Sequence, residues 1–128
     1  MAESPPQQRT VLAAVSNAVV KLHKEQFGRG PTNSRADYAG RDVLVCTLEN
    51  ALLPAERALI QMGNDQGVRD SRTQLQAATE QLFIDTIEEL TGRKVRAFAS
   101  AIDPSAGVVF EVWAFEPPDD AAGSDGRV

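Results

Sequence analysis

The chain of 128 residues has little of several features that would narrow its function. Cys46 is the only cysteine, which excludes a disulfide within the chain. Aromatic residues make up only 5%, and the formal net charge is −5, so we expect no nucleic-acid partner. No apolar run approaches the roughly 20 residues of a membrane span, and the first residues lack the basic and apolar segments of a secretory signal. We therefore expect a cytoplasmic protein without direct membrane insertion.

Patterns that carry chemistry are also missing. No metal-ligand spacing, catalytic triad or nucleotide fingerprint is present. His23, the only histidine, has no partner nearby in the sequence for acid–base work, so a surface or packing role is expected. Cys46 stands in an apolar strand without an activating neighbour, where it should act as a small hydrophobic residue. The sequence thus predicts no enzyme, no cofactor and no metal, and no deep pocket lined by converging titratable groups.

What is present is a clear hydrophobic periodicity, which centres on residues 68–101. Apolar side chains recur there at three- and four-residue steps, the period of an amphipathic helix. They are Leu75, Ala78, Leu82, Ile87 and Leu90, with Phe83 and Ile84 widening the stripe. Gly92 should end this helix as its C-cap, and alternation of period two from Val95 predicts a strand.

A first helix is predicted to begin at Ser4, which can cap it, and to end at Phe27–Gly28. Its apolar stripe is narrow and consists of Leu12, Val15, Val19 and Leu22. A narrow stripe is typical of one helix that lies on a sheet or pairs with a second copy.

Two strands and a short helix should follow. Residues 33–38 form a polar strand, and residues 43–48 form the strongest strand, which is nearly all apolar and therefore central. Pro54 begins a second, shorter helix, and the segment 63–67 should break it.

The last two strands are predicted at residues 95–102 and 108–115, joined by turn residues. Both faces of the final strand are largely apolar, so one should meet the long helix and the other a second layer or a partner. The whole predicts an α+β fold: helix, two strands, two helices, two strands, with a four-stranded, mainly antiparallel sheet packed by helices. Residues 1–116 form one domain and residues 117–128 an acidic, disordered tail. Such a sheet leaves an edge or a face uncovered, which favours a homodimer.

Several short strings together resemble the MpsC-like family, over roughly residues 11–115. They are Phe27-Gly28-Arg29-Gly30-Pro31, Leu53-Pro54-Ala55-Glu56-Arg57-Ala58-Leu59, Glu89-Leu90-Thr91-Gly92-Arg93-Lys94-Val95, and Phe98 with Ser100. The resemblance implies a small accessory member of a membrane system that translocates sodium ions, with a membrane-protein partner. It implies no catalytic residue. Leu53 departs from the family, which usually has threonine there as a helix cap.

The loop after the first helix is a candidate anion site. Glycines let backbone N–H groups converge, and an arginine can clamp a carboxylate or phosphate. The candidates are Gly28, Arg29 and Gly30, with Arg35. The alternative is an ordinary helix-to-strand turn, because nothing completes a phosphate-binding loop.

Two further groups are candidates for a partner interface. Asp85, Glu88 and Glu89 gather near the C-terminal end of the long helix, where acids oppose the helix dipole. They form either a cation site or a docking face for a basic partner, or else a solvated face that is neutralised by Arg93, Lys94 and Arg96. Trp113 and Phe115 are either core residues or interface hot spots. We therefore expect a regulatory protein that acts by binding, with a small-anion or ligand-sensing module as the alternative.

Overall fold

The computed structural model describes residues 6–118, and the order of its elements confirms the predicted α+β fold. The predicted cap at Ser4 and residues 119–128 of the predicted tail lie outside the described residues. The elements are α1 (Pro6–Phe27), β1 (Asn33–Tyr38), β2 (Val43–Glu49), α2 (Pro54–Gln61), α3 (Asp65–Thr91), β3 (Val95–Asp103) and β4 (Val108–Phe115).

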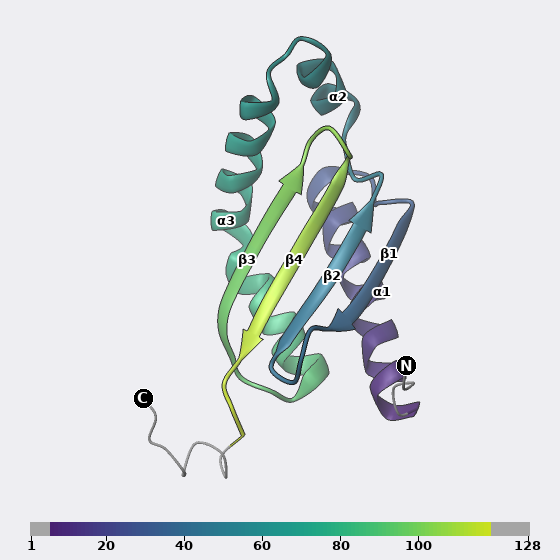
Figure 1. The fold of residues 1–128 in the computed structure, drawn as a ribbon, viewed down its shortest axis with the longest axis vertical. Coiled ribbons are helices and arrows are strands. Elements are labelled where there is room, and N and C mark those ends of the chain that lie inside the picture. Colours follow the sequence, from purple (N-terminus) through teal and green to yellow (C-terminus); the bar gives the residue numbers. More distant parts are fainter. Residues whose placement is uncertain (1–5, 119–128) are drawn as a thin grey trace.

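The four strands form one antiparallel sheet in the order β1-β2-β4-β3. The apolar strand β2 is central, as predicted, and the polar strand β1 lies at an edge. Helices α1 and α3 both lie on the same face of the sheet (Figure 1), with α1 against β1 and β2 and α3 against β3. The helices therefore cover one face of the sheet, and no element of the described chain covers the other.

The core lies between this pair of helices and the sheet. Side chains at alternate positions of β2 and β4 are fully buried there, as the pleat of a half-covered sheet requires. Trp113 and Phe115 are among them, each with 0% exposure, and the Trp113 indole Nε1 donates a hydrogen bond to the Phe83 carbonyl at 3.2 Å. Of the two roles predicted for Trp113 and Phe115, the structure supports core packing. They are not available at the surface as interface hot spots.

Helix α3 begins earlier than predicted. Residues 63–67 were expected to separate it from the second helix, yet α3 starts at Asp65. Asn64 caps it, because its side-chain Oδ1 accepts a hydrogen bond from the Gly67 N–H at 2.9 Å. The predicted end is confirmed: Gly92 is left-handed at φ 69°, and its N–H donates to the Glu88 carbonyl at 2.8 Å.

The predicted apolar stripe of α3 is wrong in its first half. Leu75 and Leu82 are 38% and 51% exposed, because Phe83 and Ile87 set the rotation of the helix and both are buried against the sheet. Going back along the helix from Phe83 at three- and four-residue steps, the sheet-facing positions are Thr79, Gln76, Arg72 and Val68. Three of these four are polar, so the helix cannot close tightly on the sheet there, and a pocket results.

Candidate functional site

A pocket of about 230 Å³ lies between α1, α3 and the strands β3 and β4. The expectation that no pocket with converging titratable groups would exist is therefore wrong. Helix α1 contributes His23, Gln26 and Phe27; α3 contributes Arg69, Arg72, Thr73, Gln76, Thr79 and Phe83; the sheet contributes Phe98, Ser100, Ala101, Ile102, Val109 and Glu111.

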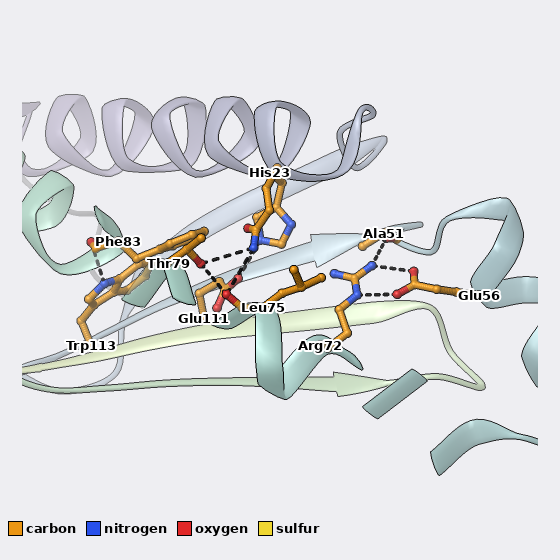
Figure 2. A network of polar contacts seen from close by, with 10 residues as sticks. His23, Ala51, Glu56, Arg72, Leu75, Thr79, Phe83, Glu111 and Trp113 are labelled. Atoms are coloured by element: carbon orange, nitrogen blue, oxygen red, sulfur yellow. Dashed lines mark hydrogen bonds and ion pairs between the residues drawn. The ribbon is translucent and has the colours of Figure 1, made fainter. Parts of the chain in front are cut away.

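A buried histidine and glutamate meet in this pocket. His23 Nε2 lies 2.6 Å from Glu111 Oε2, and each residue is only 3% exposed (Figure 2). His23 stands four residues after Val19 and so continues the buried stripe of α1, while Glu111 occupies an inward position of β4. The expectation that His23 has a surface or packing role missed this partner, which lies 88 residues away in the sequence.

The second carboxylate oxygen of Glu111 is unusual. Glu111 Oε1 is buried and has no hydrogen-bond partner among the described residues. A buried acceptor without a donor is costly, because it has lost its water and gained nothing in exchange. A donor that enters the pocket would remove that cost, so this oxygen is the chemically distinctive point of the site.

One wall of the pocket is fixed by a second ion pair. Arg72 Nε lies 2.6 Å from Glu56 Oε2, and Arg72 donates a further hydrogen bond to Glu56 Oε1 at 2.7 Å (Figure 2). Arg72 also donates to the Ala51 carbonyl at 2.8 Å, and its guanidinium carbon lies 4.2 Å from the centre of the Phe27 ring. The arginine thereby joins α3 to α2, to the loop between β2 and α2, and to α1.

Glu56 is 7% exposed and also caps α2, since its Oε1 accepts a hydrogen bond from the Leu53 N–H at 2.8 Å. Burial by itself would raise the pKa of Glu56. Hydrogen bonds from Arg72 and Leu53 and the charge of Arg72 outweigh it and lower the pKa below its ordinary value.

Arg69 stands at the exposed side of the pocket. One of its guanidinium nitrogens donates to the Ile102 carbonyl at 3.1 Å. A guanidinium has five N–H donors, so this bond leaves capacity for an anionic group.

The candidate residues of the anion loop do not converge on one site. Gly28 is left-handed at φ 82° and its N–H donates to the Lys24 carbonyl at 2.8 Å, so it ends α1. Gly30 follows it in the turn toward β1. Arg29 donates to the Leu52 carbonyl, while Arg35 donates to Asp37 at 2.9 Å on the exposed surface of β1. The two arginines thus have separate partners, as in the helix-to-strand turn that was the alternative.

The three acidic residues near the end of α3 do not act as one group either. Glu88 Oε2 accepts from the Val95 N–H at 2.9 Å and so fixes the start of β3. Asp85 accepts from Gln81 at 2.8 Å, and Glu89 is exposed. Arg93, which would neutralise these acids in the solvated-face alternative, bonds to Asp42, and its guanidinium carbon lies 4.6 Å from the centre of the Phe115 ring. A partner role for Asp85 and Glu89 stays a prediction.

The uncovered face of the sheet is a second candidate site, which we call the open face. Three rows of outward side chains cross β2, β4 and β3: Val43–Ala114–Ala97, Val45–Val112–Ala99 and Thr47–Phe110–Ala101. None of them is charged, and Phe110 is 39% exposed. Charged outward side chains lie around these rows: Glu49 ends β2, Asp103 ends β3, and Arg35 and Asp37 form an exposed pair on the edge strand β1.

Within residues 6–118, no group of side chains has the composition of a metal site. None of the helices described there combines the length and hydrophobicity needed to cross a membrane.

Residues 7–117 match the family described as "Na+-translocating membrane potential-generating system (MpsC)". No curated protein and no solved structure matches the chain.

Proposed function

This chain belongs to the MpsC family, and from that premise we propose that it is an accessory protein of a membrane system that translocates sodium ions. In this proposal it works in the cytoplasm, regulates its partner and acts by binding rather than by catalysis. The hydrogen bond of His23 favours binding, because among the described residues it goes to Glu111 and not to Ser100, the hydroxyl that also lines the pocket.

The observation that carries the proposal is the open face. Three rows across β2, β4 and β3 of this face carry only uncharged, mainly apolar side chains, and such a face is typical of a surface that another molecule covers. We propose that a second copy of this chain covers it and forms a homodimer. The edge strand carries both signs of charge in Arg35 and Asp37, which suits a self-complementary contact around a two-fold axis.

The size of the face sets the expected strength of this dimer. Four strands about 4.8 Å apart, each with about seven residues that rise about 3.3 Å, cover roughly 450 Å² in plan. Two such faces bury on the order of 900 Å², which lies at the weak and reversible end of specific interfaces. We therefore expect monomer and dimer to exchange, so that the membrane partner could compete for the same face.

Analytical ultracentrifugation tests the dimer. The mass of the wild-type protein should rise from 13.8 kDa toward twice that value as the concentration increases. Val112→Lys, which places a charge in the middle row, should remain monomeric. Glu89→Lys, an exposed change on the far side of the molecule, should associate as the wild type does. A wild-type protein that stays monomeric at all concentrations would refute the homodimer.

The pocket supports a second candidate function, the sensing of a small ligand. The sequence predicted a ligand site at Gly28, Arg29, Gly30 and Arg35. The pocket between His23 and Arg69 supports a different location for such a site. A thermal shift produced by a small ligand and lost in a pocket variant would support this function.

A further inference from the structure

We propose that the pocket binds a zwitterion of amino-acid size, with its ammonium group on Glu111 and its carboxylate on Arg69. This inference rests on the ligand-sensing candidate and is independent of the homodimer, because the pocket and the open face lie on opposite sides of the sheet.

The ammonium end follows from Glu111. Its Oε2 is occupied by His23, while its Oε1 is buried and without a partner among the described residues. An ammonium group donates hydrogen bonds and carries the opposite charge, so it satisfies a buried carboxylate oxygen better than a neutral donor does.

The carboxylate end follows from the position of Arg69 along the sheet. Arg69 bonds to the carbonyl of Ile102, and Glu111 pairs with Ser100, two residues before Ile102 on β3. The two groups are therefore offset by roughly 7 Å along the strand. An amino acid, whose ammonium nitrogen and carboxylate oxygens are three bonds apart, spans this offset with a hydrogen bond of about 2.9 Å at each end when those bonds are inclined to the strand.

Size and walls agree with this class of ligand. The volume of about 230 Å³ is small beside the roughly 300–1,000 Å³ of pockets that hold drug-sized molecules, but it exceeds the space of a few waters. Phe27, Phe83 and Phe98 line the pocket, with the rings of Phe83 and Phe98 stacked at 5.6 Å. An apolar side chain on the ligand would pack against these rings.

The test is isothermal titration calorimetry of the full chain with each of the standard amino acids, accompanied by a thermal-shift assay. At least one amino acid should bind, and its N-trimethylated form, which has no N–H donor, should bind at least about tenfold more weakly. Arg69→Gln, an exposed change that leaves the core intact, should weaken binding by a similar factor. Glu111→Gln should also weaken binding. Lys94→Gln removes one positive charge, as Arg69→Gln does, but lies outside the pocket, so this variant should bind as the wild type does.

Two results would overturn the proposal. One is that no amino acid binds at millimolar concentration. The other is that binding stays as tight as that of the unmodified amino acid to the wild-type protein when either the trimethylated form or the Arg69→Gln variant is used. Sedimentation of the same samples separates the two ideas: a dimer without ligand binding contradicts only the pocket proposal, and ligand binding by a permanent monomer contradicts only the homodimer.

Discussion

The substitution Arg72→Met should destabilise the protein strongly. Methionine keeps most of the length of the side chain but removes the guanidinium, which leaves the Glu56 carboxylate without its charged partner. The two side chains are only 10% and 9% exposed. Removing one partner of such a buried pair costs about 3–5 kcal/mol, and the loss of the bond to the Ala51 carbonyl adds about 1 kcal/mol. A domain of this size has a free energy of unfolding of about 5–15 kcal/mol. The Arg72→Met protein should therefore lose much of its stability and still fold.

Urea unfolding followed by tryptophan fluorescence measures this effect directly. Trp113 is the only tryptophan and is fully buried, so its emission reports the loss of the core. The double variant Arg72→Met with Glu56→Gln should cost about 1–3 kcal/mol less than the sum of the two single variants, because neither group is then left charged and alone. Arg57→Met is the matched control, since Arg57 is exposed and its guanidinium donates to the exposed Asn50 side chain.

A small effect would refute the reasoning. If Arg72→Met costs less than about 1 kcal/mol, the pair does not hold α2 and α3 together as described. If the double variant loses the full sum of the single losses, Arg72 and Glu56 are not coupled, whatever their distance.

Three further predictions concern other parts of the molecule. The pKa of Glu56 is lower in the folded protein than its ordinary value of 4.5. Its stabilising contribution should therefore be complete above that pH and lost as the pH falls through the folded pKa, so the free energy of unfolding should change less with acid pH in Glu56→Gln than in the wild type. Burial raises the pKa of Cys46 to about 12, so thiol reagents at neutral pH should label the protein only after it unfolds, and rapid labelling of the native chain would contradict this. Gly92→Ala should cost about 1–2 kcal/mol in urea unfolding, because φ is 69° while nothing lies near the added Cβ, and an unchanged midpoint would refute that origin.

The elements of the fold were predictable because each has a local signal. A few neighbouring residues indicate the structure in each case: the glycine at the end of α3, the turn residues between β3 and β4, and the apolar run of β2. The start of α3 was misjudged because the glycines around Asn64 look like a loop, whereas one of them supplies the N–H that Asn64 caps.

The pocket was not predictable in the same way. Its parts come from α1, α3 and the sheet, and the partner of His23 lies far along the chain. The apolar period of α3 also offered two competing faces, one through Leu75 and Leu82 and one through Phe83 and Ile87. Packing against the sheet selected the second, which carries the polar residues. One signal was available: Glu111 is a charged residue at an inward position of a strand, and such a residue needs a buried partner.

The central claim is that the open face is covered by a second copy, and cysteine labelling tests it most directly. Ala99→Cys places a thiol on the exposed middle row of that face. The native Cys46 is buried, so it should add no background labelling. The labelling rate of Ala99→Cys should fall as the protein concentration rises, whereas the rate of Glu89→Cys on α3 should not change. Equal rates for Ala99→Cys in dilute and concentrated protein would contradict the account.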